Sequence, residues 1–215
     1  LDSVRALGAA LRASRQLPAV WVQSSAVGIY GHREHGRCDE STPPGRDFMA
    51  NVCREWEAAF AAECPAAVRG VVLRIGVVLS RKGGAFPELA RLTRRFLGGT
   101  AGNGRQGISW IQIEDVEEIF LRAVDEPTMQ GAYNACSPRP VSNAEFMRTL
   151  REVLGRPWAP PAPTLFVRLF ARWPMKTDAS LILHGQYAVP ARLEAEGFRF
   201  KVHTIKSALT ALASD

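Results

Sequence analysis

The sequence predicts an α/β protein with a parallel sheet, helices on both faces of that sheet, and a small, mostly helical C-terminal region. Short, continuous apolar runs alternate along the chain with amphipathic helical patterns, which is typical of a parallel sheet covered by helices. A proline-rich stretch at 157–163 then changes the character of the chain. We therefore expect a sheet domain over residues 1–157 and a small cap over residues 158–215.

The first elements follow from periodicity and capping. Apolar residues at positions 4, 7 and 11 recur at the helical period, which predicts a helix over 2–16. Residues 18–25 form a short apolar run of the kind that is buried on both faces of a parallel sheet. A polar loop over 31–46 then leads to a helix over 47–63, for which Asp47 is the expected N-cap.

The same criteria predict the rest of the chain. Ser142 and Glu145 have the spacing of a capping box, which marks the start of a helix. In chain order we expect strands at 70–75, 108–113 and 131–136, helices at 85–97, 114–126 and 143–154, and in the cap helices at 164–173, 178–184 and 204–213.

Composition and charge exclude several classes of protein. The 215 residues are 47% hydrophobic and 22% charged, which are ordinary globular values. No apolar run approaches the roughly 18 residues of a membrane span, and no signal peptide opens the chain, so we expect a soluble, cytoplasmic protein with no membrane partner. The net charge of +6 does not gather into a basic stripe with stacking aromatics, so we expect no nucleic-acid partner.

Two motifs resemble functional sites but have simpler explanations. Residues 102–107 match the Gly-x-Gly-x-x-Gly fingerprint, yet a helix precedes them and a strand follows, the reverse of a phosphate loop. We expect a glycine-rich turn there. His32, His35 and Cys38 share a loop without a clear fourth ligand, so we expect a solvated loop and no metal.

Four motifs occur in a fixed order along the chain. They are Ser-Ser-Ala-Val-Gly-Ile-Tyr-Gly at 24–31, Leu-Arg-Ile-Gly-Val-Val-Leu at 73–79, Ser-Trp-Ile-Gln-Ile-Glu-Asp at 109–115 and Gly-Ala-Tyr-Asn-Ala-Cys-Ser at 131–137. In this order and spacing they resemble the extended short-chain dehydrogenases/reductases, which implies a Rossmann-like sheet. Residues 47–57 and the tail from 183 narrow the resemblance to the atypical, YfcH-like and SDR39U1-like epimerase family, whose members carry a DUF1731-like C-terminal extension.

The resemblance implies an NAD(P)-binding epimerase/dehydratase-like protein, with NADP favoured over NAD and an unknown small-molecule substrate. It also implies that the glycine-rich first turn and first three strands, about 80 residues, precede Leu1 and that this chain is truncated. Helices 2–16 and 47–63 resemble the pair that forms a homodimer interface in the superfamily. The cofactor would contact Ser24, Ser25, Ala26, Met49, Cys53, Arg74, Ile75, Gly76 and Val77.

The resemblance also assigns roles around this site. Ser25 would polarise a substrate carbonyl, and the substrate would lie near Phe86, Trp110 and Gln186, with core packing as the alternative for the two aromatic residues. A bulky residue in place of Gly76 is expected to abolish nucleotide affinity and to leave the fold mostly intact.

The usual proton-transfer pair of the superfamily, Tyr-x-x-x-Lys, is absent. The corresponding positions fall on Met49 and Cys53, and a thioether cannot act as an acid or base. Two hypotheses remain open: an enzyme with Ser25 and another acid or base, or a non-catalytic NADP(H)-binding sensor or scaffold.

Overall fold

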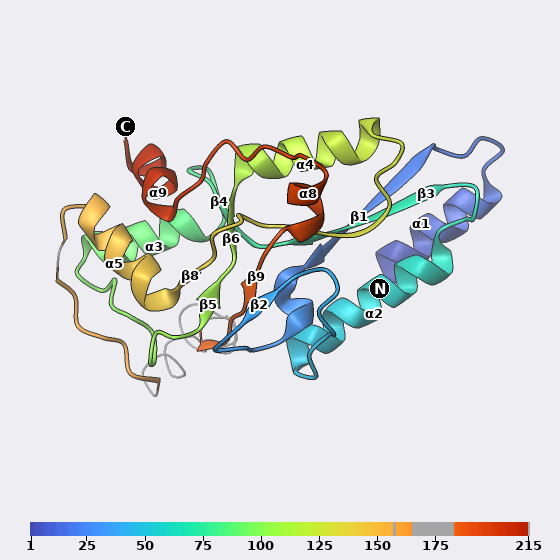
Figure 1. Ribbon diagram of the computed structural model, residues 1–215. Helices are drawn as coiled ribbons and strands as arrows, with labels where there is room; N and C mark the ends of the chain where they lie inside the picture. The colour runs from blue at the N-terminus through green and yellow to red at the C-terminus, as the bar shows by residue number, and fades with distance from the viewer. Residues whose placement is uncertain (157, 165–182, 215) are drawn as a thin grey trace.

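The computed structural model describes residues 1–156, 158–164 and 183–214 (Figure 1). The helices expected over 164–173 and 178–184 lie outside these residues for most of their length. Three parallel strands form the central sheet in the order β1-β3-β7, with the bounds Val20–Ala26, Arg69–Ile75 and Gly131–Ala135. The expected parallel sheet is confirmed.

Helices cover both faces of this sheet, as Figure 1 shows, with α1 (Asp2–Ala13) and α2 (Phe48–Glu63) on one face and α4 (Ile113–Asp125) on the other. Successive residues of β3 point to opposite faces because side chains alternate along a strand. Val72 belongs to the hydrophobic cluster beneath α1 and α2, whereas Leu73 belongs to the cluster beneath α4. Burial on both faces explains why these strands read as continuous apolar runs.

Gly76 marks a change of strand partner. The chain continues from β3 into β4 (Val77–Leu79), which pairs in parallel with β6 (Trp110–Gln112) instead of β7. At this point the backbone runs so close to Ser109 that a Cβ on Gly76 would overlap the Ser109 carbonyl oxygen. The expectation that a bulky residue at Gly76 would leave the fold intact is therefore wrong, since the neighbouring backbone would have to move.

A second core lies at one end of the molecule, where the picture shows α5 and α9 far from α1 (Figure 1). Trp110 is fully buried there among apolar residues of three helices, α3 (Ala85–Arg94), α5 (Asn143–Val153) and α9 (Ile205–Ala213).

The expected caps are present: the Asp47 carboxylate accepts the Ala50 N–H of α2 at 2.9 Å, and the Ser142 hydroxyl accepts the Glu145 N–H of α5 at 3.1 Å.

The described C-terminal residues complete both cores. Strand β9 (Tyr187–Ala188) pairs in parallel with β2 (Arg37–Cys38), which lies in the loop expected over 31–46. After β9, Leu193 of helix α8 (Ala191–Ala195) joins the cluster beneath α4, and α9 joins the second core. Residues of α8 and α9 and the segment between them are therefore packed into the same cores as residues before 157, and for these residues the expected division does not separate two independent cores.

Short elements connect these parts. The 3-10 helix η1 (Val27–Tyr30) follows β1 directly, and β5 (Gly107–Ile108) pairs antiparallel with β8 (Val141–Ser142). The Gly-x-Gly-x-x-Gly segment is the expected turn, with φ of 59° at Gly102 and 72° at Gly104, and it enters a strand rather than a helix. Within the ranges that the structure describes, no helix has the length and apolarity to cross a membrane.

Candidate functional site

The carboxyl ends of β1 and β3 lie side by side and point the same way. Ser24 pairs with Leu73, Ser25 with Arg74, and Ala26 with Ile75 in one parallel register. This edge is where open α/β sheets hold their ligands. The structure thus brings six of the nine expected cofactor contacts to one sheet edge, namely Ser24, Ser25, Ala26, Arg74, Ile75 and the adjoining Gly76.

Glu57 of α2 joins the two strand ends. The Ser25 hydroxyl donates to Glu57 Oε1 at 2.8 Å, and Arg74 donates to the same carboxylate through Nε at 2.9 Å and Nη2 at 2.8 Å. Ser25 and Arg74 are 5% and 9% exposed, so these bonds form away from bulk water. Burial alone would lower the pKa of Arg74, but the hydrogen bonds that it donates to Glu57 raise this pKa above its ordinary value, and the guanidinium stays charged.

The polar chain continues from Arg74 toward β7. Arg74 Nη1 donates to the Tyr30 hydroxyl at 3.0 Å, and that hydroxyl donates to Asn134 Oδ1 at 2.7 Å. The Asn134 amide in turn donates to the Val189 carbonyl at 2.9 Å. Burial raises the pKa of Tyr30 to about 12, although the neighbouring Arg74 charge opposes this, so the phenol is a neutral hydrogen-bond donor. We call Ser25, Glu57, Arg74, Tyr30 and Asn134 the buried polar chain.

The expected contacts Met49 and Cys53 lie under the turn that follows β1. A Cβ built on Gly28 would be 3.8 Å from Met49 Cβ and 3.9 Å from Cys53 Sγ, so both side chains pack directly against that glycine. Cys53 is 2% exposed, and burial raises the pKa of its thiol. A neutral, buried thiol beside a thioether offers no group that exchanges protons readily at neutral pH.

The remaining expected residues have different surroundings. Val77, the ninth expected cofactor contact, is exposed at the start of β4. Phe86 and Trp110 are packed inside the second core, where they have the core-packing role that the sequence left as the alternative. Gln186 contributes its backbone carbonyl, which accepts the Ser109 hydroxyl at 2.8 Å.

The loop with His32, His35 and Cys38 does not gather metal ligands. Cys38 is buried, whereas the His32 ring stacks on His184 with centroids 4.8 Å apart. Across the portions of the chain that the structure describes, no group of three or more His, Cys, Asp or Glu side chains is suited to holding a metal ion.

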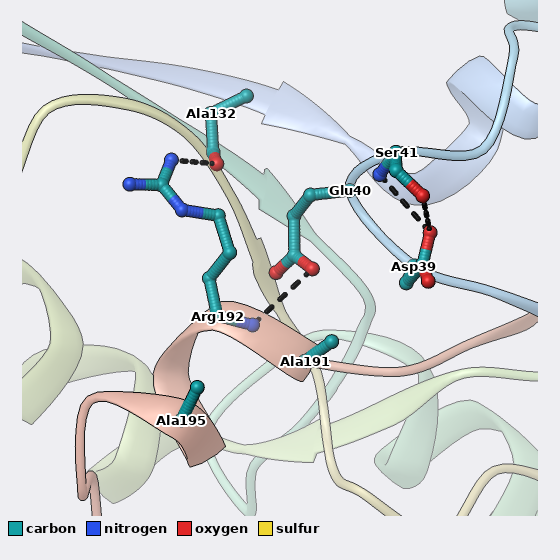
Figure 2. Close-up of a pocket in the computed structure, with 7 residues that line it drawn as sticks. All are labelled: Asp39, Glu40, Ser41, Ala132, Ala191, Arg192 and Ala195. Atoms are coloured by element: carbon teal, nitrogen blue, oxygen red, sulfur yellow. Dashed lines mark hydrogen bonds between the residues drawn. The ribbon is translucent and has the colours of Figure 1, made fainter.

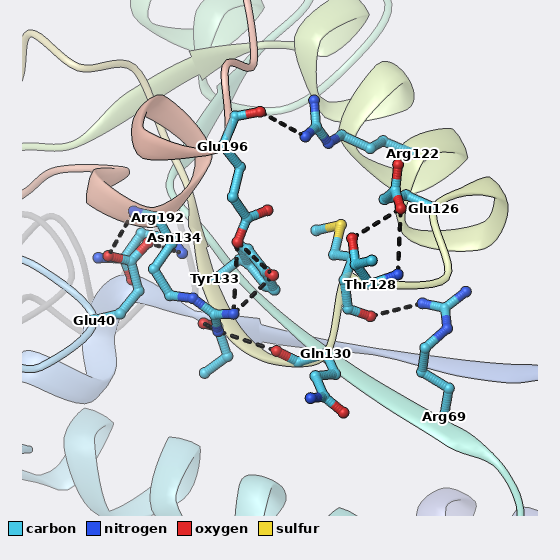
Figure 3. A network of polar contacts seen from close by, with 12 residues as sticks. Glu40, Arg69, Arg122, Glu126, Thr128, Gln130, Tyr133, Asn134, Arg192 and Glu196 are labelled. Atoms are coloured by element: carbon cyan, nitrogen blue, oxygen red, sulfur yellow. Dashed lines mark hydrogen bonds and ion pairs between the residues drawn. The ribbon is translucent and has the colours of Figure 1, made fainter.

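A second polar network closes the free edge of β7 (Figure 3). The Glu40 carboxylate accepts the Asn134 N–H at 2.9 Å and the Arg192 N–H at 3.3 Å. The Arg192 guanidinium donates to the carbonyls of Ala132 at 2.8 Å and Gln130 at 3.0 Å. Two side chains therefore satisfy backbone groups that a neighbouring strand would otherwise pair.

An open cavity of about 470 Å³ lies beside this network (Figure 2). Its lining includes Glu40 and Arg192, both of which are already engaged with β7 or with each other. The short side chains of Ala132, Ala191 and Ala195 leave the space open. It lies along the edge of β7 and includes none of the residues of the β1–β3 carboxyl edge.

Sequence reasoning missed Glu57, Tyr30 and Asn134 as members of the site. All three stand inside motifs that carried the family resemblance, but a motif does not show which side chains meet. One signal was available: Arg74 ends a buried apolar strand, and a buried guanidinium requires an acidic partner.

The parallel sheet, its helix layers and a polar carboxyl edge define a Rossmann-like α/β fold. Comparisons with known proteins narrow this class. Residues 162–212 match the family described as a domain of unknown function, DUF1731. The chain is 37% identical over 195 residues to the chloroplastic SDR39U1 homolog of Arabidopsis thaliana, covering 91% of this chain and 55% of that relative.

This chain covers a larger share of two further relatives. The SDR39U1 epimerase family protein of Bos taurus is 37% identical over 97% of this chain and 70% of its own. The crystal structure of human SDR39U1 (isoform 2) with NADPH superimposes with a TM-score of 0.90 at 32% identity, covering 99% of this chain and 71% of that one. The chain belongs to the SDR39U1 epimerase family, and it spans little more than half the length of the Arabidopsis relative.

Proposed function

We propose that this chain forms part of an NADP(H) site in an epimerase/dehydratase-like protein that acts on a small carbonyl or nucleotide-sugar substrate. The observation that carries the proposal is the register of Ser25 with Arg74, which brings the carboxyl ends of β1 and β3 together at the edge where such sheets bind nucleotides. The human relative described with NADPH supports NADP over NAD.

The residues at this edge suit the binding of a nicotinamide nucleotide. Ser24 is exposed there, and Ala26 and Gly76 at the strand ends carry little or no side chain. When bound, the nicotinamide would supply or accept hydride. The buried polar chain would keep the strand ends and α2 in a fixed geometry, because each of its members holds a hydrogen-bond partner on another element.

A second candidate function is a non-catalytic NADP(H) sensor or scaffold. It is favoured by Met49 and Cys53, which stand where the superfamily has its tyrosine and lysine, and by the neutral state of the buried thiol. The Ser25 hydroxyl also donates to Glu57, so it would have to leave that carboxylate before it polarised a substrate carbonyl.

The nucleotide site can be tested with two matched valines. Val77 is 39% exposed at the carboxyl edge of the sheet, and Val124 is 53% exposed on α4, where its carbonyl accepts Arg69 from the start of β3. We would titrate NADPH and follow its fluorescence. Val77→Trp is expected to weaken binding at least tenfold, whereas Val124→Trp should bind as the unmodified protein does. Equal affinity in all three proteins would remove the carboxyl edge from the site.

Turnover separates the two candidate functions. The protein with saturating NADP(H) would be offered a panel of carbonyl compounds and nucleotide sugars. Product formation that Ser25→Ala abolishes supports the enzyme, and tight NADPH binding without product supports the sensor.

We also propose that two copies associate through α1 and α2 in a cytoplasmic protein. Support comes from Leu7 and Trp56, apolar residues on these helices that are 45% and 37% exposed. Sedimentation of the Leu7→Glu variant should give a monomer where the unmodified protein gives a dimer; a monomeric unmodified protein would contradict this proposal.

A further inference from the structure

Three large apolar side chains are exposed together beyond the end of α3. Phe96 is 48% exposed, Leu97 is 61% exposed and Trp158 is 67% exposed. Exposed apolar side chains cost little when they are scattered, but a group of them marks a contact surface. We call these three residues the apolar tip.

The segments that carry these three residues run beside each other. Ala101 and Ala162 form a parallel bridge, and the Gly102 N–H donates to the Ala162 carbonyl at 3.0 Å. Two residues earlier the segments are still in contact, since a Cβ on Gly99 would overlap the Pro160 carbonyl oxygen. Two residues before Trp158, Arg156 Nε donates to the Arg94 carbonyl at 3.4 Å, so the two segments also meet at the end of α3.

The backbone at Phe96 is in a conformation that usually selects glycine. Its φ is 59°, and Phe96 is the only non-glycine residue with positive φ in the described ranges. The Phe96 N–H donates to the Thr93 carbonyl at 3.0 Å and the Leu97 N–H to the Leu92 carbonyl at 2.9 Å, which is the hydrogen-bond pattern of a Schellman motif. A phenylalanine here loses stability relative to glycine because of its positive φ, yet 48% of it remains exposed, so folding alone does not account for this side chain.

Three arginines lie next to Phe96, in sequence or in contact. Arg94 and Arg95 immediately precede Phe96 and are exposed, and the Arg156 guanidinium lies over the Phe96 ring, 5.3 Å from its centroid. Among the residues that the structure describes, no carboxylate forms an ion pair with any of these three arginines. The surface therefore combines protruding apolar side chains with net positive charge.

We propose that the apolar tip and these arginines bind the surface of an anionic lipid bilayer. Aromatic side chains such as Phe and Trp favour the membrane–water interface, and arginines beside them pair with anionic headgroups. Large exposed apolar side chains beside positive charge suit insertion into a soft, anionic interface. The sequence-based expectation of no membrane partner rested on spanning segments, which a peripheral contact does not need.

The test is co-sedimentation of the protein with vesicles of phosphatidylcholine alone or with 30% phosphatidylserine. The unmodified protein is expected to bind only the anionic vesicles. Phe96→Gly suits the backbone and should leave the unfolding midpoint unchanged or higher, while it weakens vesicle binding about fivefold or more. Reversing Arg94 and Arg95 to glutamate should weaken binding by at least about tenfold.

Leu121→Ala is the matched control, because Leu121 is a 64% exposed apolar residue on α4. It should bind vesicles as the unmodified protein does. No preference for anionic vesicles, or equal binding by the Phe96→Gly and unmodified proteins, would overturn the proposal. Binding to an acidic polypeptide such as polyglutamate that depends on Phe96, with no vesicle binding, would overturn it in favour of an acidic protein partner.

Discussion

Arg74 holds Glu57 in a two-point ion pair, with Nε and Nη2 bonded to separate carboxylate oxygens at 2.9 and 2.8 Å. This pair links the end of β3 to the middle of α2, and the Ser25 hydroxyl connects β1 to the same carboxylate. A buried, fully hydrogen-bonded pair of this kind fixes geometry more than it adds stability, but losing one partner leaves a buried charge unpaired.

Arg74→Met is expected to lower the free energy of unfolding by about 3–5 kcal/mol, because Glu57 and the Tyr30 hydroxyl both lose their charged partner. Urea denaturation followed by circular dichroism measures this loss. Arg91→Met is the control, since the Arg91–Glu88 pair is exposed and should contribute less than about 1 kcal/mol. Similar losses in both variants would show that burial does not distinguish the two pairs.

The stability of the protein should fall at high pH because of Tyr30. Its pKa is raised to about 12 in the folded protein by burial, so the unfolded chain, with an ordinary tyrosine pKa near 10, loses the proton first. The stability that protonated Tyr30 gives to the folded protein is fully present below pH 10 and is lost as the pH rises from about 10 to 12. Unfolding midpoints between pH 9 and 11.5 should fall more steeply in the unmodified protein than in Tyr30→Phe; parallel curves would exclude Tyr30 as the cause.

Arg192→Ala should expose the edge of β7. The variant loses the hydrogen bonds to the Ala132 and Gln130 carbonyls, and an unprotected edge strand favours intermolecular pairing. We expect a loss of about 2 kcal/mol in unfolding free energy together with faster aggregation, measured by light scattering. Arg199→Ala, at an exposed position, should match the unmodified protein in both assays.

Gly76→Ala should be destabilising by about 1–3 kcal/mol, because the added Cβ overlaps the Ser109 carbonyl where the strand changes partner. Gly83→Ala offers the comparison, since a Cβ at Gly83 meets nothing within 4 Å. Thermal unfolding of the two variants should differ clearly; equal midpoints would mean that the β3–β4 backbone shifts without cost.

The fold could be predicted where local patterns decide structure. Continuous apolar runs gave β1 and β3, and the capping residues Asp47 and Ser142 gave the starts of α2 and α5. Strands β2 and β9 were not predicted, because each has only two residues and exists through pairing with a segment about 150 positions away. No window of local sequence contains that information.

The site could be predicted only in part, for the same physical reason. Parallel strands place their carboxyl ends together, so the meeting of Ser25 and Arg74 follows from the element order. The identity of their shared partner does not: Glu57 lies in the third turn of α2, and only the packing angle of that helix decides which of its side chains reaches β3. From the sequence, Phe86 and Trp110 were equally consistent with lining a substrate pocket and with packing in the core. Their burial in the structure shows that they pack in the core.

The pairing of β9 with β2 has a consequence for how the protein is made. A ribosome delivers β9, Leu193 and the residues of α9 about 150 residues or more after β2, yet both hydrophobic clusters need these later segments. The nascent chain therefore holds unfinished apolar surfaces until these segments have been made, and neither cluster can complete its packing before then.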